Sequence, residues 1–207
     1  DFTGISIDDA IVTATTGNIS LDGRSGDSSN DGIALTSGTV VSTTGAGSGT
    51  ITFDGDGVSG GGDGIFIDDA GTLVTSVDGN IILTGDTDDE DGVRIQDNAA
   101  VVSTGTALIT INGTANTASA SDGVEIRGGS ITSGVGDILI TGLSSGDDGF
   151  DLENGGVVAS TGAASITING TTTGVNGSGS DGISIEDADT QISSTEGSIS
   201  LTGIASG

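Results

Sequence analysis

Short segments in which apolar and polar residues alternate recur along the whole chain. Residues 181–203 (DGISIEDADTQISSTEGSISLTG) contain three of them, at 183–185, 191–194 and 199–201. Alternation with a period of two places successive side chains on opposite faces of a strand, so each segment predicts a short β-strand with one buried face. Asp-Gly before the first segment and Thr-Gly after the third are typical of turns, and we expect them to bound a three-strand unit.

This three-strand unit occurs seven times. Its opening glycine recurs at intervals of 28, 32, 28, 31, 26 and 33 residues, at Gly4, Gly32, Gly64, Gly92, Gly123, Gly149 and Gly182. An apolar-x-apolar pair follows each of these glycines and marks the first predicted strand, from Ile5/Ile7 to Ile183/Ile185. The second strand has a β-branched residue and, two positions later, a small one: Val12/Ala14, Val41/Thr43, Val74/Ser76, Val102/Thr104, Ile131/Ser133, Val158/Ser160 and Ile192/Ser194. The third strand has a pair of large apolar residues, from Ile19/Leu21 to Ile199/Leu201. A glycine follows the second member of each pair by two residues.

The turns between these strands are too short for the helical crossover that an ordinary parallel sheet requires. Each strand must therefore pair with its equivalent one unit away, so the chain coils. We predict an all-β fold, a parallel β-helix (β-solenoid) of seven coils with three short strands each. It forms a single domain over residues 1–207, built from repeats of 26–33 residues. The usual handedness of parallel crossovers predicts right-handed winding.

Neither the first nor the last unit departs from the pattern, so we expect a solenoid that is uncapped at both ends. If a second copy followed Gly207, its Gly4 would lie 29 residues after Gly182, which is an ordinary interval. Bare solenoid ends pair with other chains. Two arrangements stay open: the coil continues within a longer chain, or copies of this chain associate end to end.

Composition narrows the classes of function. The chain has 30 acidic residues against Arg24, Arg94 and Arg127, with no Lys or His, and its formal net charge is −27. Nothing in it can neutralise a phosphate backbone, which excludes nucleic acid as a partner and disfavours anionic membranes. The apolar runs are only a few residues long, so we expect no membrane insertion. High net charge and few aromatic residues are also typical of disorder, but the regular repeat argues against it.

The repeat pattern D-G-[IV]-x-[IL], then [VI]-x-[ST], then G-x-[IL]-x-[IL]-x-G has a counterpart among known proteins. It resembles the β-helical repeats of large bacterial surface and secreted proteins, the filamentous-haemagglutinin-like adhesins, and the resemblance covers essentially the whole chain. It implies a secreted or cell-surface location and a structural or adhesive role. The secretion-signal domain of that family is not among these residues, so the resemblance implies no export route.

An aspartate precedes six of the seven opening glycines. Stacked coils would place these carboxylates in one column, about 4.8 Å apart: Asp31, Asp63, Asp91, Asp122, Asp148 and Asp181. Neighbouring charges at that distance repel by about 1 kcal/mol in water. Calcium would relieve this repulsion, which makes the column a candidate calcium ladder. The alternative is that Asp-Gly is simply a favoured turn dipeptide whose carboxylate bonds backbone amides, and no calcium-binding motif is present.

A second predicted column is apolar and exposed. If Val12, Val41 and their equivalents point inward, the residues before them point outward: Ile11, Val40, Leu73, Val101 and Val157, interrupted by Ser130 and Gln191. A flat face with aliphatic and hydroxyl side chains is unusual for a solitary soluble monomer, so we expect a lateral contact between rods. The alternative is that these side chains tuck under the neighbouring corner.

Catalysis and ice binding find less support. Paired acids recur after the first strand (Asp8/Asp9, Asp68/Asp69 and Glu186/Asp187), and two carboxylates can cleave a glycosidic bond. Recurrence in several coils favours a structural corner instead, and the chain has no His, Lys, Trp or Tyr. The outward positions of the third strand form only a broken array of Thr, whereas ice binding requires a regular one. We therefore expect no enzyme activity.

These features together predict a structural repeat segment of an extracellular or cell-surface protein. It would form a stiff shaft or fibre by end-to-end continuation of the solenoid, with self-association end to end or laterally and with calcium as its one cofactor. The alternative is an adhesin passenger module whose corner loops bind a receptor or a glycan.

Overall fold

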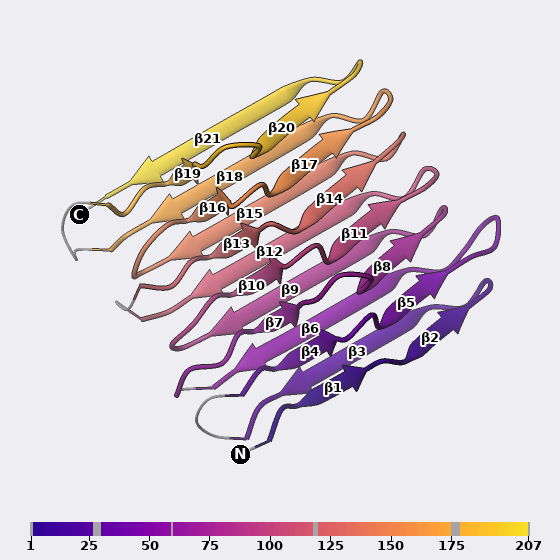
Figure 1. Cartoon of the computed structure of the whole chain (residues 1–207), viewed down its shortest axis with the longest axis horizontal. Coiled ribbons are helices and arrows are strands. Elements are labelled where there is room, and N and C mark those ends of the chain that lie inside the picture. Colours follow the sequence, from indigo (N-terminus) through magenta and orange to yellow (C-terminus); the bar gives the residue numbers. More distant parts are fainter. Residues whose placement is uncertain (1, 27–29, 59, 118–119, 175–178, 207) are drawn as a thin grey trace.

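The computed structural model of the chain is an all-β solenoid of seven coils stacked along one axis (Figure 1). It describes residues 2–26, 30–58, 60–117, 120–174 and 179–206. Within these residues, 21 strands form three parallel sheets of seven, and every coil contributes one strand to each sheet. This confirms the predicted fold class and the number of coils. None of the described residues belongs to a helix that could span a membrane.

The strands of each sheet follow the order of the coils, from the N-terminal coil to the C-terminal one. The first sheet contains β1 (Ile5–Asp8), β4 (Ile33–Thr36), β7 (Ile65–Ile67), β10 (Val93–Gln96), β13 (Val124–Arg127), β16 (Phe150–Glu153) and β19 (Ile183–Ile185). The second contains β2 (Ile11–Ala14), β5 (Val40–Thr43), β8 (Leu73–Ser76), β11 (Ala100–Ser103), β14 (Ser130–Ser133), β17 (Val157–Ser160) and β20 (Gln191–Ser194). The third contains β3 (Ile19–Arg24), β6 (Ile51–Gly57), β9 (Ile81–Thr87), β12 (Ile109–Ala115), β15 (Ile138–Ser144), β18 (Ile166–Thr172) and β21 (Ile199–Ala205).

The core consists of columns of aliphatic side chains that run along the solenoid axis. Ile109 of β12 pairs in register with Ile81 of β9 and with Ile138 of β15, and all three side chains are almost fully buried. The same holds for the first sheet, where Val93 pairs with Ile65 and Val124. Because like residues stack on like, each of the five inner coils buries its apolar face against the coils on both sides of it.

The second strand of the fourth coil differs from the prediction by one residue. Val101 pairs with Val74 and Ile131 and is fully buried, so it points into the core and does not belong to the exposed apolar column. Two valines adjoin at this place in the sequence, and a slip of one residue exchanges the faces of a strand. The outward column instead contains Ile11, Val40, Leu73, Ala100, Ser130, Val157 and Gln191.

Truncation of the two valines tests this register. Val101→Ala should lower the free energy of unfolding by about 2 kcal/mol, because it removes buried methyl groups and leaves a cavity. Val102→Ala, on the outer face of the same strand, should change it by less than about 0.5 kcal/mol. Denaturant unfolding of both variants measures the difference, and a larger loss for Val102→Ala would restore the register predicted from the sequence.

The glycines that open each unit lie at bends, but those that close it are not turn residues, contrary to our prediction. The third strands run on through them, so that β12 extends from Ile109 past Gly113 to Ala115. A Cβ atom on Gly113 would lie 1.8 Å from the backbone oxygen of Gly123, and one on Gly92 would lie 2.2 Å from the backbone nitrogen of Thr114. The third and first sheets therefore meet backbone to backbone, in a space that only glycine leaves open.

The paired acids after the first strand form a structural corner, as their recurrence predicted. Asp9, Asp69 and Asp187 have positive φ angles of 46°, 77° and 69°, a conformation that Asp and Asn tolerate better than most residues. Gly38 and Gly155 adopt positive φ in the same corner of other coils. These acids are spread over the coils because each coil turns here.

Candidate functional site: the acidic corner

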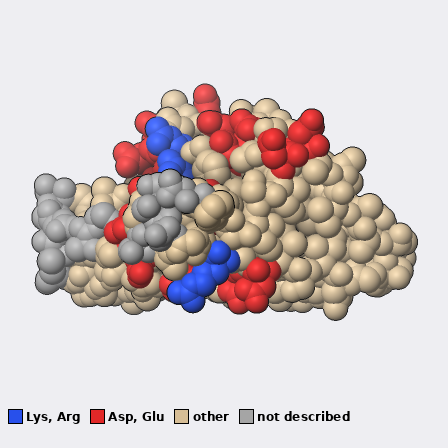
Figure 2. Space-filling model, turned by 90° about the horizontal axis from the view of Figure 1, so that it is seen from below, with Lys and Arg blue, Asp and Glu red and all other residues tan. Residues whose placement is uncertain are grey.

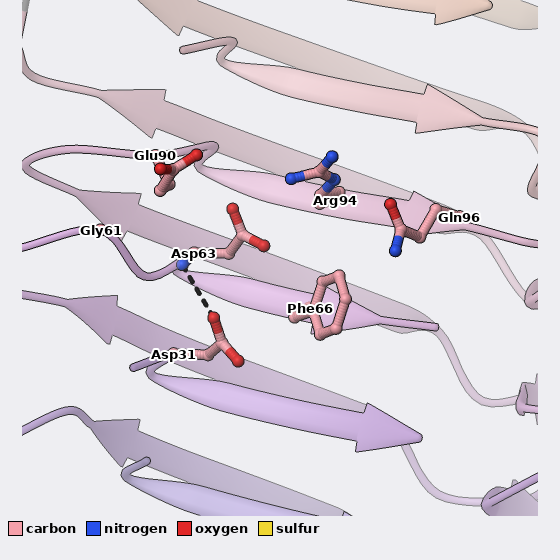
Figure 3. Close-up of a pocket in the computed structure, with 7 residues that line it drawn as sticks. All are labelled: Asp31, Gly61, Asp63, Phe66, Glu90, Arg94 and Gln96. Carbon is pink, nitrogen blue, oxygen red and sulfur yellow. Dashed lines mark hydrogen bonds between the residues drawn. The ribbon is translucent and has the colours of Figure 1, made fainter. Parts of the chain in front are cut away.

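The six predicted aspartates form one column, and hydrogen bonds join its members. The backbone N–H of Asp63 donates to Oδ1 of Asp31 at 2.9 Å, as Figure 3 shows. Each later aspartate donates in the same way to the one before it, at 3.0, 2.7, 2.8 and 2.5 Å for Asp91, Asp122, Asp148 and Asp181. These carboxylates thus bond backbone amides, as the turn alternative proposed, but the amides belong to the next coil.

Backbone bonds complete this column. The carbonyl oxygen of Asp63 accepts the N–H of Gly32 at 2.9 Å, and that of Asp91 accepts the N–H of Gly64 at 3.0 Å. Each aspartate before Asp181 therefore connects to the coil before it through its carbonyl and to the coil after it through its side chain. The sequence alone predicted that these residues form a column, but it did not predict the hydrogen bonds by which they join successive coils.

A second polar column lies beside the aspartates, on the outer face of the first sheet. Its members pair in register from one coil to the next, and they are Ser6, Ala34, Phe66, Arg94, Glu125, Asp151 and Ser184. Three consecutive members are ionisable: Arg94 on β10, Glu125 on β13 and Asp151 on β16. The columns predicted from the sequence did not include the outward positions of the first strand, although all three residues follow their opening glycine by two positions.

Each arginine of the chain pairs with the acid that lies in register with it on the next coil. Arg24 lies 3.3 Å from Asp56, Arg127 lies 3.2 Å from Glu153, and Nε of Arg94 lies 2.6 Å from Oε2 of Glu125. The Arg94–Glu125 contact is the most buried of the three. Its two atoms approach closely without the angle of a hydrogen bond, so the pair is an ionic contact.

Carboxylates outnumber cations around Arg94. Its Nη1 also lies 3.6 Å from Oδ2 of Asp91, and Asp122, Glu125 and Asp151 lie in the next two coils. We call Asp91, Asp122, Glu125, Asp148 and Asp151 the acidic cluster. Figure 2 shows acidic side chains gathered in separate patches, with Arg side chains beside them and broad uncharged surface elsewhere in that view.

Burial perturbs the titration of the acidic cluster. Loss of solvation and then the charge of Asp91 raise the pKa of Asp122 to about 9 and that of Glu125 to about 8, where Arg94 opposes the rise at Glu125. Loss of solvation raises the pKa of Asp151 to about 7 and that of Asp148 to about 6. The pKa values of Asp63 and Asp91 also rise because both carboxyls are buried. The carboxyls of the cluster therefore stay protonated to a higher pH than exposed carboxyls do.

Three members of the cluster converge on one point. One carboxylate oxygen from each of Asp122, Glu125 and Asp151 lies within 4.8 Å of the other two. Of the predicted calcium ladder, only Asp122 belongs to this group; the other five aspartates lie along the column without such convergence among the described residues. Oxygen donors of this kind suit hard cations.

A shallow hollow of 290 Å³ lies on the N-terminal side of this cluster (Figure 3). Carboxylates and one guanidinium line most of it, and Phe66 provides the aromatic part of the wall. Its lining is Asp31, Gly61, Asp63, Phe66, Glu90, Arg94 and Gln96. A hollow with this polar lining suits water and small ions better than an apolar ligand.

The exposed apolar column is less exposed than predicted. Val40, Leu73 and Val157 are half-buried, and only Ile11, in the first coil, is largely exposed. With Val101 in the core and Ala100, Ser130 and Gln191 in the column, the apolar face is interrupted. The structure thus weakens the argument for a lateral contact, which rested on a continuous apolar face.

Comparison with known proteins adds no relative to this description. No protein family, curated protein or solved structure matches the chain. Function is therefore inferred from the chemistry of the coils themselves.

Proposed function

We propose that this chain is a stiff structural rod of an extracellular or cell-surface protein, and that further coils of the same kind stack on its two end faces. One observation carries the proposal. Ile166 and Ile168 of β18 are fully buried, whereas the residues stacked directly on them, Ile199 and Leu201 of β21, are 44% and 45% exposed. The two strands differ in that β18 lies between two coils and β21 borders one.

The C-terminal end face therefore exposes the core of the solenoid. Its exposed core positions are Ile185, Ile199 and Leu201. Within the described residues, β21 pairs only with β18, which leaves one row of backbone groups on its far side available for pairing. A further coil satisfies both requirements at once, because it brings matching aliphatic columns and a parallel strand edge.

The N-terminal end face offers that match. Ile5, Ile7, Val12 and Leu21 are only partly buried against the core. They begin the columns that end at Ile183, Ile185, Ile192 and Leu201 in the seventh coil. Stacking the first coil of one copy on the seventh coil of another repeats the pairing seen within the chain. Such a contact is heterologous and non-closing, so it produces filaments.

A mechanical role also agrees with how the coils are joined. Backbone bonds along the axis, the aspartate column and three ion pairs all connect successive coils. A rod of this kind resists bending because every coil is held by its neighbours. The extracellular location rests on the resemblance of the repeat pattern, and a mechanical role requires no catalytic group.

Electron microscopy of the purified 207-residue chain tests the proposal. At salt that screens the net charge of −27, we expect thin filaments with an axial repeat of about 34 Å, from seven strand spacings of about 4.8 Å. Leu201→Lys places a charge in the end face and should leave short rods. Ser200→Lys adds the same charge on the outer face of β21 and should leave the filaments intact. Short monodisperse rods of the unmodified chain at every salt concentration would contradict end-to-end stacking.

A further inference from the structure

When its carboxyls are ionised, the acidic cluster carries more negative charge than the described side chains around it balance. Arg94 is the one cation in contact with it, and Arg94 already pairs with Glu125 and Asp91. The next arginine, Arg127, pairs with Glu153 on the outer face. Asp122 and Asp151 therefore have no cationic partner among the ion pairs of the described residues. Like charges in a poorly solvated corner repel more strongly than they do in water.

An unsatisfied oxygen points to what is missing. Oδ1 of Asp151 is buried and has no hydrogen-bond partner, and the whole residue is only 8% exposed. Buried carboxylate oxygens are almost always bonded, because leaving one unbonded costs free energy. One carboxylate oxygen of Asp151 also converges with oxygens of Asp122 and Glu125, so a ligand bound at that point touches all three residues.

The remaining geometry favours a divalent cation. In the aspartate column, Oδ1 of Asp122 accepts the N–H of Asp148, which leaves Oδ2 to face another partner. Calcium binds oxygen at 2.3–2.6 Å, so ligands on opposite sides of one ion lie about 4.6–5.2 Å apart. Three oxygens within 4.8 Å of one another are close enough to bind one ion of this size. Magnesium demands near-ideal octahedral geometry and gives up its waters reluctantly, so the more flexible coordination shell of calcium suits three carboxylates better.

We propose that Asp122, Glu125 and Asp151 bind one calcium ion that clamps the fifth coil to the sixth. Glu125 and Asp151 stand opposite each other on β13 and β16, and Asp122 lies on the corner that leads into β13. The ion lies where the outer face of the first sheet meets the aspartate column. Three carboxylates fill part of a shell of six to eight ligands, and water fills the rest, so we expect a dissociation constant of about 0.1–1 mM.

Thermal unfolding of the full chain, with calcium chloride against a chelator at matched ionic strength, tests the site. At 10 mM calcium we expect the melting temperature to rise by about 3–10 °C, and by less with 10 mM magnesium. Titration calorimetry with calcium should give one site per chain. No rise beyond that given by sodium chloride of equal ionic strength would overturn the proposal.

Two isosteric variants separate this site from diffuse binding by surface acids. Asp151→Asn removes a ligand and a buried charge, so it should raise the melting temperature in chelator and abolish the rise with calcium. Asp31→Asn changes a member of the aspartate column outside the site, and its amide oxygen still accepts the N–H of Asp63. It should keep the full calcium response. An equal loss of response in both variants would assign calcium to the whole column and overturn the three-residue site.

Discussion

Replacing Gly113 with alanine is expected to destabilise the solenoid by about 3 kcal/mol or more. The new Cβ would lie 1.8 Å from the backbone oxygen of Gly123 and 2.8 Å from a methyl carbon of Val124. The backbone oxygen cannot move away, because its carbonyl accepts the N–H of Val93 in the coil before it. The third sheet must therefore separate from the first around β12, in the middle of the stack.

A matched control distinguishes this clash from an effect of glycine on the unfolded chain. A Cβ on Gly134 would meet only Oγ1 of Thr161, at 3.9 Å, and Gly134 is not among the glycines with positive φ. Gly134→Ala should therefore be neutral or stabilise the chain by up to about 1 kcal/mol, since alanine reduces unfolded-state entropy. In thermal unfolding, Gly113→Ala should lower the melting temperature by about 6–12 °C. Equal melting temperatures for the two variants would show that the glycine columns do not hold the sheets together.

Raising the pH from 5 to 9 in the presence of a chelator is expected to destabilise the protein. Burial raises the pKa values of Asp148, Asp151, Glu125 and Asp122 to about 6, 7, 8 and 9, above those of exposed carboxyls. The folded state therefore holds protons that the unfolded chain has released. This contribution is full below the unfolded pKa values and is lost as the pH rises through the folded ones.

The groups that face the cluster set the direction of this effect. The negative charges of Asp91, Asp147, Asp181, Glu153 and Glu186 raise the pKa values of the cluster, and Arg94 is the cation that lowers them. We expect a loss of about 3 kcal/mol, the order of the cost of charging buried carboxylates, and a fall in melting temperature of about 6–12 °C.

Two substitutions check that the acidic cluster causes this pH dependence. Asp122→Asn keeps an oxygen for the N–H of Asp148 and removes the ionisation at the highest pH, so it should flatten the profile between pH 7 and 9. Asp54→Asn, on the exposed face of β6, should leave the profile unchanged. A stability that rises from pH 5 to 9 would show that the column is ionised and satisfied in the metal-free fold.

Local pattern determined most of the architecture. A period of two specifies a strand and its inward face, and the spacing of Gly92, Gly123 and Gly149 specifies one coil per unit. The inward pairs of the first and third strands lie where the pattern placed them, as Val93/Ile95 and Ile109/Ile111 show. These features were predictable because each depends on residues adjacent in the sequence.

The tertiary structure decided what depends on the neighbouring coil. Two adjacent valines allowed two registers for β11, and stacking on Val74 and Ile131 selected Val101. Gly-containing dipeptides are typical of turns. In the structure, however, Gly113 lies within a strand and packs against Gly123, where the third sheet meets the first.

The acidic cluster was likewise predictable only in part from the sequence. The sequence identified Asp122 as one of a column, whereas its convergence with Glu125 and Asp151 required the register between β13 and β16. Their burial, and with it the rise of their pKa values, comes from coils 26 to 31 residues away in the sequence. Pairing across that separation, and the loss of solvation it imposes, depends on contacts that no local pattern contains.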